Sequence, residues 1–424
     1  MSVDVLLGLQ WGDEGKGKIV DYLAPQYDVV ARFQGGPNAG HTLEFDGIKH
    51  VLHQIPSGIF HERIKNIIGN GVVLDPVVFK KEITGLQKFN INFKKNLFIS
   101  KKAQVILPSH KFLDDAYEKA KGDSKIGSTL RGIGPAYQDK IARQGLRVGD
   151  IVSPAFEDKY RHLLNLHKTI LRYYNYEADF TEKEKEFEDA LHFMKSFNII
   201  DSEYFINQAI GNKEKILAEG AQGSLLDIDF GSYPFVTSST TMTAGACTGL
   251  GVAPSKIKNV YGIFKAYCTR VGSGPFPTEQ VNDIGETLRK QGNEYGSTTG
   301  RPRRCGWIDI PALKYAIMLN GVTELMMMKV DVLNSFQEIK VCTHYKLADG
   351  TLTDQLPYDL CAANYEPVYT TLPGWHCDLS AYRDRNSFPQ QLKDYVCFLE
   401  NALNTPITII SIGPDRNQTV STKS

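Results

Sequence analysis

A glycine-rich segment near the start of the chain has the composition of a phosphate-binding loop. Residues 8–18 read GLQWGDEGKGK. Glycines in such a run let backbone N–H groups curl around phosphate oxygens, and the start of a following helix adds a favourable dipole. The standard P-loop has Ser or Thr after its lysine, whereas Gly17 follows Lys16 here, so the Asp13 carboxylate would have to offer Mg²⁺ an oxygen instead. The pattern favours phosphate binding, with a glycine-rich surface turn as the alternative.

A second glycine-rich loop, residues 34–42, places a histidine beside several backbone donors. In that setting His41 could act as a general acid or as a phosphate partner. A single histidine is as often a surface residue or a satisfied core residue. The loop by itself leaves both interpretations of His41 open.

Arginines and hydroxyls are concentrated in residues 296–304, which read GSTTGRPRR. Three guanidinium groups beside three hydroxyls suit bidentate recognition of a carboxylate or a phosphate. Pro302 restricts Arg301 to extended conformations, which helps to project its side chain. A solvated basic turn would account for the arginines but not for the adjoining hydroxyls and glycines.

A lysine and an aspartate follow an apolar run that ends at residue 328. The Asp331 carboxylate could accept both N1–H and the exocyclic amine of guanine, while the stem of Lys329 lies against the base. The tripeptide Lys329-Val330-Asp331 has a pattern that is common by chance, so it is weak evidence alone. Two polar segments, residues 219–223 and 233–239, are expected to be loops that follow a strand, where open α/β sheets bind substrates.

The elements that would position these groups alternate between strands and helices. Residues 3–8 form a short apolar run ending in glycine, and residues 16–23 are compatible with a helix. Further buried strands are expected at Val29–Phe33, Asn66–Ile68, Ile216–Ala218, Val260–Tyr267, Leu325–Val330 and Ile407–Ile412. Strands that are apolar throughout are typical of sheets covered on both faces. The sequence therefore predicts an α/β fold with a large, mostly parallel central sheet covered by helices.

Domain organisation follows from what interrupts this pattern. Residues of about 154–200 are almost free of Gly and Pro and repeat apolar residues at three- and four-residue spacing, which predicts a largely helical elaboration. There is no internal repeat and no Pro/Ser-rich linker. We expect one domain over residues 1–424 with this elaboration inserted.

Composition excludes several function classes. The chain has 48 Lys and Arg against 48 Asp and Glu, so no overall field favours nucleic acid or an anionic membrane. No apolar run is long enough to span a bilayer, and the first residues lack the basic region of a signal peptide. The seven cysteines form no C-x-x-C pair, which fits a reducing cytoplasm.

Taken together, the motifs resemble those of the adenylosuccinate synthetase family. The resemblance runs from Val5 to about Arg416 and rests on the joint order of several motifs. They are residues 10–18, 36–42, 127–135, 219–223, 274–279, 298–301 and 413–416.

The resemblance implies a GTP-dependent ligase that joins IMP to L-aspartate, giving adenylosuccinate, GDP and phosphate. This is the first committed step from IMP to AMP, and it passes through a 6-phosphoryl-IMP intermediate. It implies that Asp13 is the base and His41 the acid, with Lys16 and Gln222 also catalytic. One Mg²⁺ per subunit would lie on Asp13 and the carbonyl of Gly40.

The resemblance also implies three sets of substrate contacts. GTP would contact Gly12, Asp13, Glu14, Gly15, Lys16, Gly17, Lys18, Gly40, His41, Thr42, Arg303, Lys329, Val330, Asp331, Ser411, Ile412 and Gly413. IMP would contact Asp13, Glu14, Gly15, Lys16, Asn38, Ala39, Gly40, His41, Thr129, Arg143, Gln222, Thr237 and Arg301. Aspartate would contact Val271, Ser297, Thr298, Thr299, Gly300, Arg301 and Arg303. Arg143 would reach in from a second subunit, so a cytoplasmic homodimer with shared sites is implied.

Three residues depart from the usual family pattern. Pro302 replaces a frequent arginine, Val330 a leucine and Thr240 an asparagine. None of these changes removes a group implied in catalysis.

A GTP-binding regulatory switch with GTPase activity is the alternative. A switch should have Ser or Thr where this chain has Gly17, and it would not need arginines that bind carboxylates. The sequence therefore favours the ligase.

Overall fold

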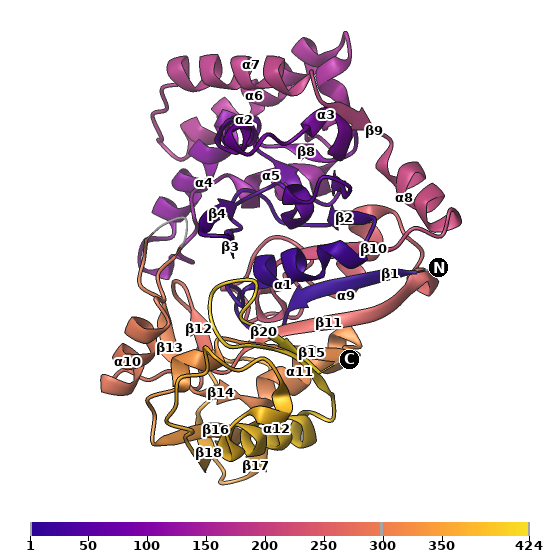
Figure 1. Cartoon of the computed structure of the whole chain (residues 1–424). Helices are drawn as coiled ribbons and strands as arrows, with labels where there is room; N and C mark the ends of the chain where they lie inside the picture. Colours follow the sequence, from indigo (N-terminus) through magenta and orange to yellow (C-terminus); the bar gives the residue numbers. More distant parts are fainter. Residues whose placement is uncertain (1, 297–299, 423–424) are drawn as a thin grey trace.

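A sheet of ten strands forms the centre of the computed structural model, which describes residues 2–296 and 300–422. Its strand order is β20-β19-β15-β11-β1-β10-β2-β5-β7-β9 (Figure 1). All neighbours from β19 to β9 pair in parallel, and β20 pairs antiparallel at one edge. The strands are β1 Val3–Gly8, β2 Val29–Arg32, β5 Lys65–Ile68, β7 Leu97–Ser100, β9 Asn198–Ile200, β10 Ile216–Gly223, β11 Ile257–Lys265, β15 Glu324–Met328, β19 Ile407–Ser411 and β20 Thr419–Ser421.

Helices and four smaller sheets surround these strands. The helices are α1 Lys16–Leu23, α2 Pro76–Leu86, α3 Phe93–Asn96, α4 Pro108–Ala120, α5 Ile133–Ala142, α6 Phe156–Tyr173, α7 Thr181–Met194, α8 Ser202–Gly211, α9 Thr243–Leu250, α10 Asp283–Gln291, α11 Ile310–Asn320 and α12 Gln390–Leu403. The smaller sheets are made of β3 His41–Phe45 with β4 Ile48–Leu52, β6 Val73–Leu74 with β8 Gln104–Val105, β12 Cys268–Arg270 with β13 Arg304–Gly306, and β14 Ile308–Asp309 with β16 Glu338–Leu347, β17 Leu352–Thr353 and β18 Tyr365–Pro373.

Both faces of the sheet are buried, as the apolar strands predict. In β1, Val5 and Leu7 belong to one apolar cluster that includes residues of α9, α11 and α12. Leu6 belongs to another cluster, with Ile19 and Val20 of α1. Successive side chains of a strand point to opposite faces, so helices must cover both. The expected mostly parallel, helix-covered α/β sheet is confirmed.

The seven expected strands all lie in this sheet, but one expected loop is wrong. β10 continues through residues 219–223, which pair with the ends of β1 and β2. Polar residues can extend this strand because they are buried against other polar groups, as Glu219 is against His41. β15 ends at Met328, two residues earlier than predicted, because Lys329 has a left-handed backbone (φ 59°) and a 3₁₀ turn follows.

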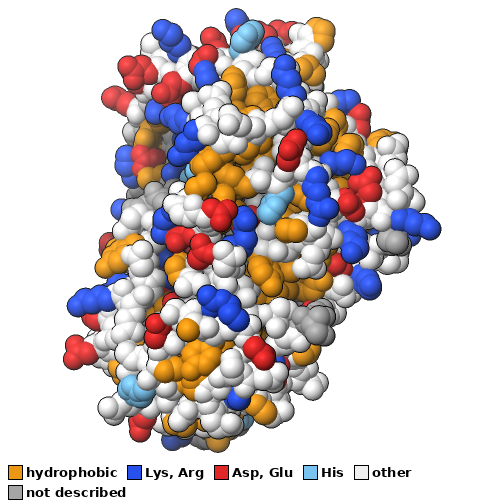
Figure 2. Space-filling model, viewed as in Figure 1, with side chains coloured by type: hydrophobic (Ala, Val, Ile, Leu, Met, Phe, Trp, Pro, Cys, Tyr) orange, Lys and Arg blue, Asp and Glu red, His pale blue; other side chains and the backbone are white. Residues whose placement is uncertain are grey.

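The helix-rich segment contains α6 and α7, which lie at one end of the molecule, with β16 and β18 at the opposite end (Figure 1). On the face drawn in Figure 2, basic and acidic side chains are interspersed, in keeping with the balanced composition. None of the helices in the described part of the chain combines the length and apolarity needed for a bilayer crossing.

Candidate active site

A cavity of about 970 Å³ opens where several parallel strands end. Its walls include the segments that follow β1, β15 and β19 and the last part of β10. Carboxyl ends of parallel strands meet at one edge of a sheet, where α/β proteins bind ligands. The expected site residues that line it are Gly12, Asp13, Glu14, Gly15, Lys16, Gly17, Lys18, Asn38, Ala39, Gly40, His41, Thr42, Thr129, Gln222, Thr237, Val271, Arg303, Lys329, Asp331, Ser411 and Gly413.

The phosphate-loop candidate is held in shape by its own carboxylate. Glu14 is fully buried and accepts the backbone N–H groups of Gln10 (3.1 Å) and Gly12 (2.9 Å). Its other oxygen accepts Lys16 Nζ at 2.5 Å. The loop is therefore preformed, and the Lys16 ammonium is already paired inside it.

The glycine after Lys16 has a steric reason. A Cβ at Gly17 would lie 2.8 Å from the Cβ of His41 and 3.2 Å from its backbone. The P-loop Ser or Thr cannot stand here without separating the two glycine-rich loops. Gly17 thus brings the histidine loop against the start of α1.

His41 is held by a buried carboxylate on β10. Its Nδ1–H donates to Glu219 Oε1 at 2.5 Å, and Ser57 donates its N–H and hydroxyl to the same carboxylate. Arg32 lies 4.0 Å from Glu219. Burial, reinforced by the Arg32 charge, lowers the pKa of His41 to about 4. Its Nε2 is buried without a hydrogen-bond partner in the described residues, so the imidazole is oriented with one nitrogen available to a ligand.

Asp13 is paired across the cavity. Its backbone has φ 58°, and its Oδ2 accepts Arg303 Nε at 2.8 Å. Arg303 also donates to Glu294 at 2.6 Å. The expected base is therefore joined to an arginine 290 positions later in the chain.

Three more acceptors in the cavity wall lack partners within the described ranges. They are Asn38 Oδ1, Gln222 Oε1 and Asp331 Oδ1, all buried. Leaving buried polar atoms unpaired costs about 1–3 kcal/mol each, so these positions suit a ligand that presents hydrogen-bond donors.

Lys18 fixes the end of β19 and the loop after it to the first helix. Its Nζ donates to Ser411 Oγ (2.7 Å) and to the carbonyls of Gly413 (2.7 Å) and Gln418 (3.0 Å). Burial lowers the pKa of Lys18 to about 8. Burial also raises the pKa of Asp331, and Lys329 and Lys18 oppose that rise.

Some expected site residues lie elsewhere. Val330 and Ile412 are buried in the apolar core, so only their backbone atoms could meet a nucleotide. Arg143 is exposed at the end of α5 and does not line this cavity, and neither Gly300 nor Arg301 is in its wall. Ser297, Thr298 and Thr299 lie outside the described residues.

Two buried glutamates, Glu219 and Glu294, were not assigned a role from the sequence. Each contacts an expected site residue directly. Glu219 stood in a polar segment interpreted as a loop, and Glu294 is a single acidic residue before the arginine-rich segment. Only the tertiary contacts identify them.

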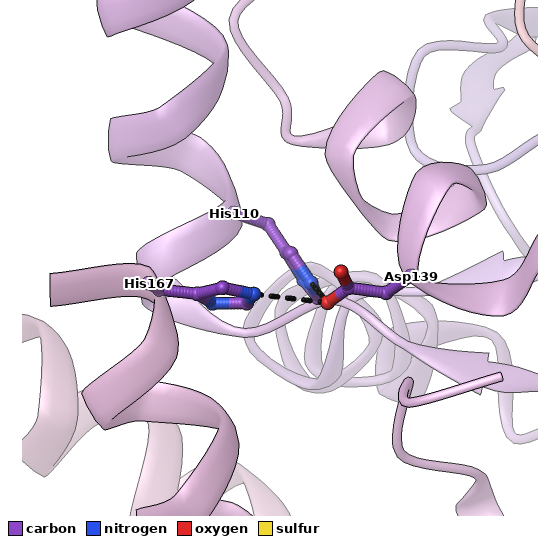
Figure 3. Close-up of side chains that lie close together, drawn as sticks. All are labelled: His110, Asp139 and His167. Atoms are coloured by element: carbon purple, nitrogen blue, oxygen red, sulfur yellow. Dashed lines mark hydrogen bonds and ion pairs between the residues drawn. The ribbon is translucent and has the colours of Figure 1, made fainter. Parts of the chain in front are cut away.

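One cluster of His and Asp in the described chain is close enough to hold a metal ion, and it is not at the cavity residues expected to bind one. Asp139 Oδ2 meets Nε2 of His110 (2.8 Å) and of His167 (3.0 Å) (Figure 3). His110 Nδ1 accepts the N–H of Leu107, so in the neutral ring Nε2 carries the proton. Burial keeps the pKa of His110 low. The cluster is accounted for as a hydrogen-bonded link among α4, α5 and α6.

Comparisons with known proteins identify the family of the chain. A family model described as adenylosuccinate synthetase matches residues 5–420. Relatives named adenylosuccinate synthetase include one from Cytophaga hutchinsonii, 66% identical over 422 residues (99% of this chain, 98% of the relative). Another, from Flavobacterium psychrophilum, is 60% identical over 423 residues (99% and 100%).

Solved structures give the same result. The fully ligated adenylosuccinate synthetase from Plasmodium falciparum has a TM-score of 0.93 at 38% identity, covering all of both chains. A cyanophage S-2L succinoaminodeoxyadenylate synthetase shares the fold, with a TM-score of 0.65 at 21% identity over 100% of this chain and 96% of that one. The chain belongs to the adenylosuccinate synthetase family, the GTP-dependent ligases that join IMP to L-aspartate as adenylosuccinate on the route to AMP.

Proposed function

We propose that the ligation proceeds in two steps on the residues of this cavity. Asp13 removes the N1 proton of IMP, and O6 attacks the γ-phosphorus of GTP to give 6-phosphoryl-IMP and GDP. Lys16 stabilises charge on the phosphates as the bond breaks, and so does His41 once its Nε2 carries a proton. The side-chain amide N–H of Gln222 holds O6. The amine of aspartate then displaces phosphate from C6. Phosphoryl transfer of this kind depends mainly on positioning and charge neutralisation.

The observation that carries this proposal is the convergence of the four groups on one cavity. Asp13 and Lys16 follow β1, His41 begins β3, and Gln222 is on β10. His41 Nε2 has no partner among the described residues, and the side-chain amide of Gln222, whose N–H would donate to O6, lines the same wall. A base, a phosphate partner and an O6 contact are thus available to one substrate pair.

The substrates are proposed to occupy different parts of the cavity. IMP would contact Asn38, Thr129, Gln222 and Thr237, with Arg301 and the partner's Arg143 completing its site. The guanine of GTP would contact Lys329 and Asp331, and its phosphates residues 12–18 and 40–42. Aspartate would contact Val271, Arg301, Arg303 and residues 297–300.

Mg²⁺ would be held by Asp13 and the carbonyl of Gly40. Both residues line the cavity, and a carboxylate with a carbonyl is a donor set of hard oxygens that suits this ion. Arg303 holds Oδ2 of Asp13, and Oδ1 is outside that bond. When bound, the ion would supply positive charge to phosphate oxygens.

We also propose a cytoplasmic homodimer of one-domain subunits. Arg143 is exposed, and the cavity of its own chain does not include it, which supports a role at a neighbouring subunit's site. Residues from position 11 to position 414 line one cavity, which supports a single working unit.

The first experiment would follow purine absorbance after mixing the protein with IMP, GTP, Mg²⁺ and aspartate, and then omit each component in turn. Product formation that requires all four supports the proposal. GTP hydrolysis indifferent to IMP and aspartate would favour a regulatory switch and would overturn the assignments outside the phosphate loop.

A further inference from the structure

One fully buried carboxylate collects donors from three separate segments around the cavity. Glu294, which follows α10, accepts Lys265 Nζ (3.0 and 3.1 Å), Lys329 Nζ (2.9 Å) and Arg303 Nη1 (2.6 Å). The hydroxyl of Tyr267 donates to it as well. The side chain of Glu294 has no exposed surface.

These donors lead to different parts of the cavity. Arg303 continues to Asp13 at 2.8 Å. Lys329 belongs to the expected guanine site, and its Nζ also donates to the carbonyl of Gly292. Lys265, at the end of β11, is fully buried and donates its backbone N–H to Gln10 Oε1. Glu294 therefore lies between the expected catalytic base and the expected guanine site.

The charge balance gives Glu294 an organising role. Three cations surround this one carboxylate, and without it their mutual repulsion would act in a buried setting. Lys and Arg side chains have many rotamers, so a shared carboxylate restricts both Arg303 and Lys329 before any ligand arrives. A carboxylate that merely neutralised Lys265 would not need to contact Arg303 and Lys329 as well.

We propose that Glu294 is a positioning residue that holds Arg303 and Lys329 in their binding arrangement and so couples the aspartate and guanine parts of the site. The inference rests on the proposed roles of Arg303 and Lys329. It predicts that one change at residue 294 weakens the binding of GTP and of aspartate together. IMP binding is expected to change less, because its proposed contacts do not bond Glu294 and only Asp13 is linked to it, through Arg303.

The test is steady-state kinetics of Glu294→Gln, which keeps the size of the side chain and removes its charge. We expect KM for GTP and KM for aspartate each to rise about tenfold or more, and KM for IMP by less than about threefold. Glu294→Asp, which restores the charge on a shorter stem, should recover part of both losses. The matched control is Glu279→Gln, because Glu279 pairs with Arg304, the neighbour of Arg303, outside the cavity. It should leave both KM values within about twofold.

A second variant covers the case in which Glu294→Gln fails to fold, since Lys265 would then be buried without its counterion. The double variant Glu294→Gln with Lys265→Met removes that buried charge and still leaves Arg303 and Lys329 without their carboxylate. KM for GTP and KM for aspartate are expected to rise together in this double variant, as in Glu294→Gln. Unchanged KM values for GTP and aspartate in a folded variant would overturn the proposal.

Lys329→Met in the otherwise unaltered protein tests the proposed guanine site separately from the proposed role of Glu294. If it leaves KM for GTP unchanged, the proposed guanine site is wrong. If it raises KM for GTP while Glu294→Gln does not, the guanine site stands and the role of Glu294 falls.

Discussion

Replacing Asp331 by asparagine should change which purine the enzyme accepts. The carboxylate stands just after β15, and its Oδ1 is buried with no hydrogen-bond partner among the described residues. Guanine offers two adjacent donors, N1–H and the exocyclic amine, and an ionised carboxylate accepts both. Each hydrogen bond to a charged group contributes about 1.5–3 kcal/mol. Asparagine keeps one acceptor and turns a donor toward the other position.

The expected loss for GTP is therefore about 3 kcal/mol, or about 100-fold in kcat/KM. The assay measures kcat/KM for GTP, ITP and XTP at saturating IMP and aspartate. ITP lacks the amine and should lose less, while XTP, with a carbonyl at C2, should gain relative to GTP. Asp415→Asn removes a carboxylate from the loop after β19, also near Lys18, and should leave the order of the three nucleotides unchanged. A full GTP preference in Asp331→Asn would refute the assignment.

Three other changes test the site and its support. Mixing Arg143→Leu protein with Asp13→Ala protein should restore about a quarter of the activity, because about half of the dimers are hybrids and each hybrid has one intact site. If no activity returns although the subunits are shown to exchange, sharing of Arg143 is excluded. Glu219→Gln should lower kcat at least about 100-fold, since the uncharged amide can turn its NH₂ toward Nδ1 of His41 and favour the other tautomer. It should also cost about 3–5 kcal/mol in urea unfolding, because the buried Arg32 loses its counterion. An unchanged kcat would contradict the orienting role. Burial holds the pKa of His110 below its usual 6.5, so below about pH 6.5 the unfolded chain takes up a proton that the folded state does not, and stability falls by up to about 1.4 kcal/mol per pH unit. His110→Gln should reduce this change of the unfolding free energy with pH, as measured by urea titrations at pH 7.5, 6.5 and 5.5. If the variant shows the same pH dependence as the original protein, the effect belongs to other groups.

The sheet was predictable because burial on both faces leaves an apolar run that is visible in the sequence. β7, β9 and β20 were missed, since they are short strands at or near the edges with less distinctive composition. β10 was cut short because its polar half is paired with other buried polar groups, and such pairing has no local signature.

The site was predictable where motifs are contiguous, as in residues 8–18, and not where single residues meet across the fold. Glu294 is one such residue, because its three cationic partners lie 29, 35 and 9 positions away in sequence. Its role depends on strand order, which no local pattern encodes.

The bond from Lys18 to Ser411 has a consequence for biosynthesis. These residues are 393 positions apart, yet they close the same wall of the cavity. At about 5–20 residues per second, a ribosome that has made the phosphate loop needs about 20–80 s more to make β19. For about the last 4–16 s of that interval β15 (Glu324–Met328) is already made and waits for its outer neighbour. Its exposed edge is then a place where nascent chains can pair wrongly. Nucleotide binding would thus begin only as β19 docks against β15.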